Sequence, residues 1–327
     1  MAVYKKIKNS NGRVHHRIFG VKILSHKAKT IFKSIDSDLG RPQWYAKCAS
    51  YADFISDKGL QEYIKKILAQ SESIRSDTEF IAINGWCEIC GKTTQMKTRP
   101  SELFFMHMFT CQSCVAAGAL TVSRTRAMYE FARGIYPPPS GSVKTPVRVY
   151  MDEAVTDSFR TFQKLYGPEN VVGAEYMGPD KICGHIYNGI MHQDATRLSF
   201  TNDEFDLIIS QHVLEHIPDY KQVLAEYLRV LKPGGKFAVS IPFNDYSEKT
   251  VVRAEVLQDG TINHIMPPEI HGNPVDSGGS LAFYNHGWEF LDAMRQVGFE
   301  DVNAHYYYNP TRGHFGLHMI ICGTKPK

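Results

Sequence analysis

The sequence lacks several features that would assign it to a specialised class of protein. It has no uninterrupted run of about 18–20 apolar residues, which excludes an integral membrane protein with a spanning helix. Its first ten residues, MAVYKKIKNS, are charged and polar where a signal peptide would carry an apolar stretch. It also has no internal repeat and no low-complexity tract. We therefore expect a globular protein in the cytoplasm.

The composition is that of an ordinary globular protein, but the charge is unevenly distributed. Of 327 residues, 43% are hydrophobic and 22% are charged, which is typical of a chain with a packed core. Residues 1–50 hold eleven Lys and Arg against two Asp, a balance of +9, whereas the other 26 basic and 32 acidic residues give the rest of the chain −6. This basic arm can bind an anionic surface, such as the inner face of a membrane, or can be a solvated tail; the sequence leaves both alternatives open.

The cysteines indicate a metal site. Four of the seven form two CxxC pairs, separated by twenty residues. In a cytosolic chain this pattern favours metal over disulfides, because four thiolates can surround one Zn²⁺ at about 2.3 Å and leave no open position. We predict a structural zinc ion held by Cys87, Cys90, Cys111 and Cys114. The alternative is four unrelated buried or redox cysteines. His107 is interpreted as a surface or packing residue, and Cys183 and Cys322 as small core residues.

Length and linker residues suggest how the chain is organised. The length suits one domain of about 180–200 residues with an appended module. GIYPPPSGSVKTP, with three consecutive prolines, is typical of a linker. We predict four regions in chain order: a basic arm and helical region over 1–80, helical from residue 43, a zinc-binding module over 81–133, a linker over 134–146 and the main domain over 147–327.

The main domain alternates strands and helices. Strands are predicted over 147–151, 171–176, 190–195, 205–211, 236–243 and 316–324. Helices are predicted over 157–167, 219–231 and 287–299. FDLIISQ at 205–211 is a near-continuous apolar run, as expected for a central parallel strand. The alternation indicates an α/β, Rossmann-like fold with an open, mostly parallel sheet covered by helices. Such sheets bind ligands beyond the carboxyl ends of their strands.

Acidic residues lie at or near the ends of three successive predicted strands. They are Glu153, Glu175 and Asp194, separated by 22 and 19 residues. A carboxylate at the end of the second strand can bind the two hydroxyls of a ribose, and one at the next strand can accept a hydrogen bond from an adenine amino group. The alternative is that these are ordinary loop acids. The spacing favours a nucleoside-containing cofactor.

Residues 192–243 resemble the class I S-adenosylmethionine-dependent methyltransferases, particularly their small-molecule branch. The pieces that carry the resemblance are QDATRLSF, FDLIISQHVLEHI and LRVLKPGG. The wider resemblance covers about 147–325 and extends to bacterial proteins in which a zinc ribbon precedes this domain. It implies a seven-stranded sheet whose last strand is antiparallel and S-adenosylmethionine (SAM) as cofactor. It further implies that Glu175 binds the ribose, that Asp194 and Ala195 bracket the adenine, and that Gln211 and His212 line the methionine end.

The sequence departs from this family in the first turn. The family has a GxGxG loop there, whereas this chain has MDEAVT at 151–156 with no glycine. A non-glycine residue at positive φ costs about 1–2 kcal/mol, so the turn must take another shape. We expect Glu153 to reach the cofactor's amino group and the helix N-terminus at Thr156 to lie beside the cofactor.

Two histidines are the candidate catalytic residues, because unperturbed histidine titrates near neutral pH. His271 lies in PPEIHGNPVDSGGS, an insertion whose counterparts cap the substrate pocket in this fold, and His216 lies in VLEHIPD. Each has a structural alternative: packing or capping for His216, and a hydrogen-bonded turn for His271.

The predicted function is SAM-dependent methyl transfer to a small-molecule or glycan-related acceptor at oxygen. The glycan suggestion rests on RIFGVKIL at 17–24, which looks similar to N-terminal stretches of bacterial polysaccharide glycosyltransferases. One alternative is a non-catalytic adaptor that uses the zinc ribbon and basic arm for partner binding. A second is an RNA methyltransferase, but SELFFMHMF near the cysteines has no Lys or Arg to bind phosphates, so nucleic acid is not an expected partner.

Overall fold

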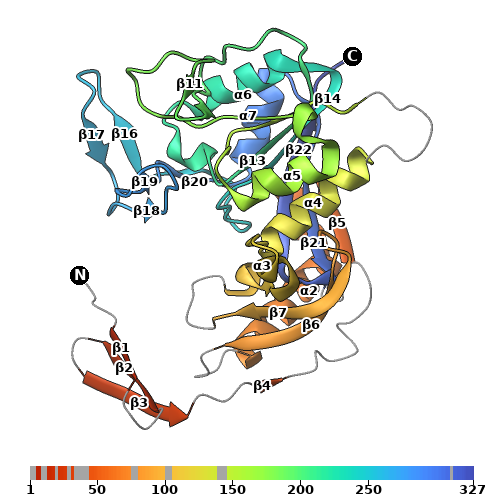
Figure 1. Ribbon diagram of the computed structural model, residues 1–327. Helices are drawn as coiled ribbons and strands as arrows, with labels where there is room; N and C mark the ends of the chain where they lie inside the picture. The colour runs from red at the N-terminus through yellow and green to blue at the C-terminus, as the bar shows by residue number, and fades with distance from the viewer. Residues whose placement is uncertain are drawn as a thin grey trace. The chain divides into compact units, whose positions relative to one another are not determined.

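The computed structural model describes residues 5–8, 13–18, 21–27, 31–32, 44–74, 80–99, 105–137, 146–309 and 312–327. Two compact units form. The first comprises the segments 1–44, 62–127 and 308–318, and the second comprises 45–61, 128–307 and 319–327. Figure 1 labels the elements. Among the described residues, no helix is both long enough and apolar enough to cross a membrane. The predicted linker lies largely outside the described residues.

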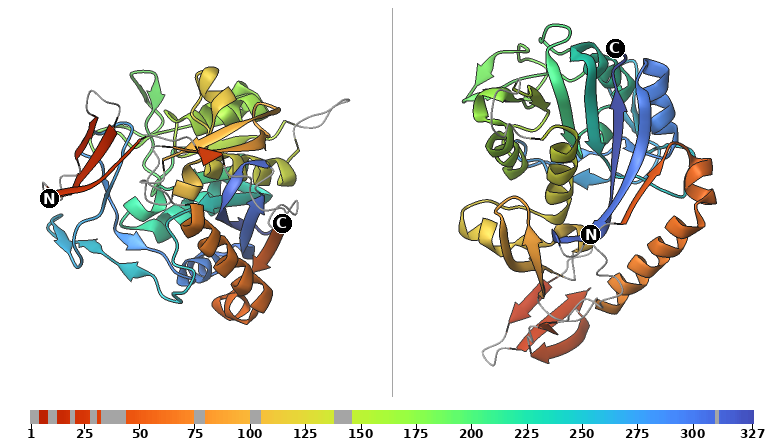
Figure 2. Two further views of the ribbon diagram at one scale, coloured as in Figure 1. Left: turned by 90° about the horizontal axis from the view of Figure 1, so that it is seen from below. Right: turned by 90° about the vertical axis from the view of Figure 1, so that its right-hand side faces the viewer.

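The second unit is built on a seven-stranded sheet. Its strands, from one edge to the other, are β10 (Val171–Gly173), β9 (Val149–Met151), β13 (Phe205–Gln211), β14 (Leu231–Ser240), β22 (His314–Thr324), β21 (Glu300–Asn309) and β5 (Trp44–Cys48). The first four are parallel, whereas β22 is antiparallel to β14. Figure 2 shows β21 and β22 as two long blue strands lying side by side. The predicted Rossmann-like, seven-stranded sheet with an antiparallel last strand is confirmed.

One predicted strand does not belong to this sheet. Residues 190–195 do not form a strand of this sheet; β12 (Ile190–Met191) instead pairs with β11 (Ile186–Tyr187). The reason is the Asn188-Gly189 turn between them, where both residues have positive φ, as in a tight two-residue hairpin. A single parallel bridge from His192 to Glu175 remains.

The strand that completes the sheet comes from a region predicted to be helical. In β5 (Trp44–Cys48), Ala46 and Cys48 are buried and Lys47 is exposed, which is the alternation of an extended strand. The predicted helical pattern is confirmed only after it, in α1 (Tyr51–Ser56) and α2 (Lys58–Ile74). Phe54 of α1 is fully buried, and its ring centroid lies 5.5 Å from that of Trp288 and 5.6 Å from that of Tyr306. The segment 45–61 therefore belongs to the core of the second unit.

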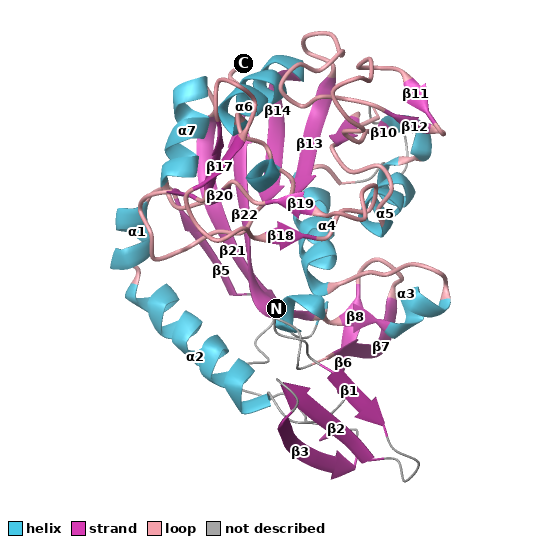
Figure 3. Cartoon of the chain, turned by 90° about the vertical axis from the view of Figure 1, so that its left-hand side faces the viewer, coloured by secondary structure: helices cyan, strands magenta, loops and turns pink. Residues whose placement is uncertain are grey.

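Helices cover both faces of the sheet, and alternate residues of each strand face opposite layers. Val149, Met151, Leu207 and Ile209 pack with buried residues of α4 (Ser123–Ile135) and α5 (Asp157–Tyr166). On the other face, Tyr150 lies 6.2 Å, centroid to centroid, from Tyr227 of α6 (Tyr220–Val230). Figure 3 shows α6 and α7 (Glu289–Val297) on one side of the sheet and α5 on the other. β13 is thus buried on both faces, as its apolar sequence predicts.

An insertion of short strand pairs separates β14 from α7. It comprises β15 (Val251–Val252) with β20 (Tyr284–Asn285), β16 (Ala254–Val256) with β17 (Ile262–His264), and β18 (Ile270–His271) with β19 (Ser280–Leu281). The last pair carries His271. Three short 3₁₀ helices complete the described elements: η1 (Phe105–Met108), η2 (Pro168–Asn170) and η3 (Leu214–His216).

The first unit contains two small sheets. β1 (Lys5–Lys8), β2 (Arg13–Ile18) and β3 (Val21–Lys27) are antiparallel and lie within the predicted basic arm. The other sheet has the order β4 (Ile31–Phe32), β6 (Ile81–Cys87), β7 (Lys92–Thr98), β8 (Thr110–Cys111) and is followed by α3 (Gln112–Ala116). Its core consists of few residues: Ile81, Ile83, Cys87, Met96, Phe109, Cys111 and Cys114.

Candidate cofactor and metal sites

The structure brings the four cysteines of the two CxxC pairs together. All four sulfur atoms lie within 4.8 Å of one another. The Sγ atoms of Cys87 and Cys114 are 3.8 Å apart, as are those of Cys90 and Cys111. Zn–S bonds of about 2.3 Å in a tetrahedron place the sulfurs about 3.8 Å apart, so these two separations match those of a zinc site.

Local backbone geometry explains the convergence. β6 and β7 form a hairpin in which Cys87 pairs with Lys92, and Gly91 closes the turn at φ +63° while donating its N–H to the Cys87 carbonyl. β8 then pairs antiparallel with β7 and places Cys111 opposite Met96. The hydrogen bond between the two thiols lowers the pKa of Cys111 and raises that of Cys114.

A buried arginine adjoins the cysteine site. Arg126 is fully buried and donates to the carbonyl oxygens of Thr121, at 2.7 Å, and Gly313. Burial lowers the pKa of Arg126, and negative charge on the four cysteines opposes that shift. Four thiolates around one Zn²⁺ would carry a net charge of −2, which the guanidinium of Arg126 would partly balance. His107 packs against His318, with ring centroids 4.6 Å apart.

The predicted cofactor residues gather at the carboxyl ends of β9, β10 and β13. Glu175, which follows β10, accepts hydrogen bonds at Oε1 from the backbone N–H of Ala154 (2.8 Å) and Val155 (3.1 Å). The turn without glycine is therefore held by the carboxylate predicted to bind the ribose. Burial raises the pKa of Glu175, although these backbone hydrogen bonds oppose the shift.

The predicted methionine-end residues are linked to the first turn. Gln211, the last residue of β13, donates from Nε2 to Oε1 of Glu153 at 2.7 Å and to the hydroxyl of Ser158. Thr156 caps α5 by accepting from the Phe159 N–H at 3.1 Å. His212 follows β13 in the left-handed region at φ +57°. These contacts fix the edge where the resemblance places the cofactor.

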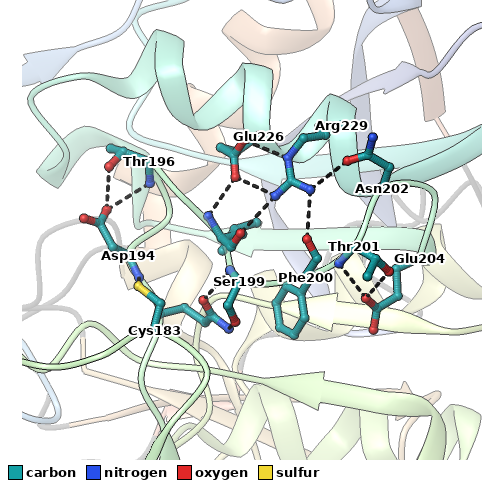
Figure 4. A network of polar contacts seen from close by, with 12 residues as sticks. Cys183, Asp194, Thr196, Ser199, Phe200, Thr201, Asn202, Glu204, Glu226 and Arg229 are labelled. Atoms are coloured by element: carbon teal, nitrogen blue, oxygen red, sulfur yellow. Dashed lines mark hydrogen bonds and ion pairs between the residues drawn. The ribbon is translucent and has the colours of Figure 1, made fainter.

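Asp194 and Ala195 occupy a tight turn instead of a strand end. Asp194 accepts at Oδ1 from the N–H (3.0 Å) and the hydroxyl (2.6 Å) of Thr196, and its own N–H donates to Sγ of Cys183, which is only half-buried. Figure 4 shows this turn beside the network in which Arg229 donates to Glu226, Asn202 and the backbone of Phe200. The bridge between Glu175 and His192 keeps the turn next to the end of β10.

A cluster of histidines surrounds Glu215, a residue that the sequence analysis did not select. His212 Nδ1, His216 Nε2 and His271 Nδ1 lie 3.5, 3.7 and 3.7 Å from Oε1 of Glu215. Burial alone would raise the pKa of Glu215, but the three histidines outweigh it and lower the value to about 2. The interaction with Glu215 in turn raises the pKa of His271. The two predicted catalytic histidines thus meet at one buried carboxylate.

Asp152 is a second buried carboxylate that the sequence analysis passed over. Its Oδ2 accepts from the hydroxyls of Ser210 (2.5 Å) and Tyr227 (2.7 Å), and burial outweighs these hydrogen bonds to raise its pKa to about 7. Its position directly after β9, beside Glu153, is the sequence signal that could have identified it. The corresponding signal for Glu215 is its place next to His216.

Comparisons with known proteins find similarity to methyltransferases. Residues 164–239 match the family model described as Methyltransferase domain. The chain is 28% identical over 153 residues to the ubiquinone/menaquinone biosynthesis C-methyltransferase of Vibrio campbellii, covering 45% of this chain and 56% of that relative. It is 28% identical over 177 residues to the demethylmenaquinone methyltransferase of Anoxybacillus flavithermus, covering 50% of this chain and 68% of that one. The chain thus spans little more than half the length of the first relative.

A crystal structure of an S-adenosylmethionine-dependent methyltransferase from Mesorhizobium loti aligns with 61% of this chain and 97% of its own, at 17% identity and a TM-score of 0.38. The fold assignment rests on the strand order described above. Together with the match of residues 164–239 to a methyltransferase domain, this strand order supports a Rossmann-like methyltransferase fold.

Proposed function

We propose that this protein transfers a methyl group from SAM to an oxygen atom of a small-molecule or glycan-related acceptor. The observation that carries the proposal is the joining of three strand ends: Glu175 binds the turn after β9, and Gln211 at the end of β13 binds Glu153 in that turn. In sheets of this type, ligands bind beyond such ends. SAM, when bound, supplies a methyl group on a positively charged sulfur, open to in-line displacement.

The chain's own residues position the reactants. Glu175 uses Oε1 for the backbone of the first turn, which leaves Oε2 for the ribose hydroxyls. Glu153 and Gln211 hold the methionine end, with Thr156 at the start of α5 and His212 after β13. Asp194 and Ala195 lie beside the adenine. Because an in-line displacement needs alignment above all, these contacts supply the main part of catalysis.

We propose that the acceptor binds on the side of the site where the histidine cluster around Glu215 lies. A hydroxyl acceptor must lose a proton during transfer, and His216 and His271 are the groups proposed to handle it. C-methylation of a quinone-like ring is the second candidate, because the matched relatives are named for that reaction. Assays that separate O-methyl from C-methyl products distinguish the two.

The four cysteines are proposed to hold a structural zinc ion, since the closed set of four sulfurs leaves no position for substrate. The predicted regions 1–80, 81–133, 134–146 and 147–327, the cytoplasmic location and the contact of the basic arm with an anionic surface stay predictions. Vesicles containing anionic lipid, tested by sedimentation at low and high salt, address the last of these.

We expect Glu175→Ala to weaken SAM binding at least tenfold, measured by isothermal titration calorimetry on zinc-loaded protein. Loss of a charge-assisted hydrogen bond costs about 1.5–3 kcal/mol, and the turn at Ala154 and Val155 loses its acceptor as well. Glu175→Gln keeps an oxygen for the turn and should have a smaller effect. S-adenosylhomocysteine titrations should show the same order.

Glu300→Ala, which removes an exposed carboxylate at the start of β21, is the matched control and should bind SAM as the wild type does. Well-folded wild-type protein that binds neither SAM nor S-adenosylhomocysteine would contradict the proposed enzyme and favour the adaptor. Binding unaffected by Glu175→Ala would contradict the assignment of the ribose site alone.

A further inference from the structure

The histidine cluster around Glu215 has the composition of a metal site. One donor atom from each of Glu215, His216 and His271 lies within 4.8 Å of the other two. Glu215 and His216 belong to η3, directly after the carboxyl end of β13, and His271 comes from β18 in the insertion. Two histidines and a carboxylate form a set that first-row divalent metals prefer.

Glu215 is a buried carboxylate that faces three histidines but has no direct hydrogen bond from them. Its side chain is fully buried, and neither carboxylate oxygen has a hydrogen bond of ordinary length from the described residues. An ionised carboxylate in such surroundings is costly unless it is paired or coordinates a metal. The three histidine nitrogens around Oε1, at 3.5–3.7 Å, are too far away to satisfy it by hydrogen bonding.

In each of the two histidine rings, the nitrogen that faces away from Glu215 already has a hydrogen-bond partner. His216 Nδ1 lies 2.9 Å from the carbonyl oxygen of Leu281, and His271 Nε2 lies 3.0 Å from Oε1 of Glu269. Metal-bound histidines characteristically donate their second N–H to a carbonyl or a carboxylate, which fixes the tautomer. Here that tautomer directs the lone pairs of His216 Nε2 and His271 Nδ1 toward Glu215.

The spacing suits coordination after a small contraction. Metal–ligand bonds of about 2.1 Å place neighbouring ligand atoms about 3.0–3.4 Å apart. His216 Nε2 and His271 Nδ1 each lie 3.7 Å from Oε1 of Glu215, so each of these two separations must shorten by a few tenths of an ångström. His212 Nδ1 lies 3.5 Å from the same carboxylate oxygen but does not belong to the set of three whose donor atoms all lie within 4.8 Å of one another. The remaining positions of the ion stay open.

The geometry points to a second metal site, in which Glu215, His216 and His271 bind a divalent first-row transition-metal ion that holds the acceptor oxygen. This inference rests on the proposed methyl transfer and gives His216 and His271 a different task from free bases. A hydroxyl on such an ion loses its proton to solvent water more readily. The resulting oxygen attacks the methyl carbon, the C–S bond breaks, and its electron pair stays on sulfur to give S-adenosylhomocysteine.

Metal binding can be measured independently of turnover. Mn²⁺ favours oxygen and nitrogen ligands over thiolates, so it reports this site without occupying the four-cysteine site. We expect the free-ion electron paramagnetic resonance signal of MnCl₂ to fall as one equivalent binds to full-length protein that carries one zinc ion per chain. Excess zinc must be removed first, because Zn²⁺ binds histidine and carboxylate ligands more tightly than Mn²⁺ does. His271→Ala and Glu215→Gln should each weaken this binding at least tenfold. His264→Ala, an exposed histidine of β17, should leave it unchanged.

Calorimetric titration with SAM distinguishes failure of the proposed metal site from failure of the proposed function. His271→Ala lies outside the proposed cofactor residues and should bind SAM as the wild type does, so loss of Mn²⁺ alone identifies the metal site. His271 lies in a half-exposed insertion strand, so its variant remains informative if Glu215→Gln fails to fold. Absence of Mn²⁺ binding to the wild type, or binding that is equal in wild type and His271→Ala, overturns the metal site and leaves the proposed function standing. Failure of the wild type to bind SAM overturns the proposed function.

Discussion

Replacing Cys111 by serine is expected to abolish zinc binding and to unfold the region around β6, β7 and β8. The apolar core of this region has only a few side chains besides the cysteines themselves. Structural zinc sites of this kind contribute an apparent binding free energy of about 10–16 kcal/mol, which exceeds the stability of most small domains. Serine is a poor zinc ligand, and Cys111 is fully buried. Elemental analysis should show zinc falling from one ion per chain to well below that.

Hydrogen exchange of the Cys111→Ser variant should show lost protection of backbone amides in 81–98 and 110–127. The matched control is Cys183→Ser, which changes a half-buried thiol of the second unit. It should retain one zinc ion and wild-type protection. A Cys111→Ser protein that still holds one tightly bound zinc ion would contradict the four-cysteine site.

Asp152→Asn is expected to stabilise the protein, and to do so more strongly as pH rises. The ordinary pKa of this carboxyl is 3.8, and burial raises it to about 7 in the folded chain. Between these values the unfolded chain releases the proton while the folded chain keeps it, so rising pH favours unfolding. The penalty is absent below the unfolded pKa and reaches about 4 kcal/mol above pH 7. Asparagine removes it because it cannot ionise.

Urea denaturation at pH 5 and pH 8 measures this effect. The gain in free energy of unfolding from Asp152→Asn should be about 1–2 kcal/mol at pH 5 and about 4 kcal/mol at pH 8. Asp292→Asn removes a carboxylate whose side chain is 61% exposed, and should change stability little at either pH. Equal gains at the two pH values would show that Asp152 is already ionised in the folded protein.

The parts of the fold that could be predicted are those that depend on a residue pattern within a single helix or strand. The short, near-continuous apolar run of β13 predicts a buried strand, and the helical spacing of the apolar residues in α6 predicts a helix. Both elements appear at the predicted residues. The Asn188-Gly189 dipeptide is also a local signal, and it indicates the hairpin that forms in place of the predicted strand. β5 was not predictable in this way, because five residues acquire a strand conformation only when β21 provides the partner edge.

The candidate site likewise has one part that chain position predicts and another part that depends on the folded structure. Chain position places Glu153, Glu175 and Gln211 at strand ends, and the structure connects them. The contact of Glu175 with the N–H groups of Ala154 and Val155 joins residues about twenty positions apart, and it depends on how a turn closes in space. Likewise, no spacing rule links His271 to Glu215, since the two residues lie 56 positions apart in the sequence (271 − 215).

The place of β5 at the sheet edge has a consequence for any attempt to isolate the methyltransferase-like region. A chain beginning at residue 147 would leave β21 with an unpaired row of backbone N–H and C=O groups. It would also lose Phe54, which covers Trp288 and Tyr306. Long bare strand edges recruit strands from other molecules and drive aggregation. Residues 44–61 thus act as a built-in cover against self-association, and an insoluble truncated product would reflect the loss of that cover.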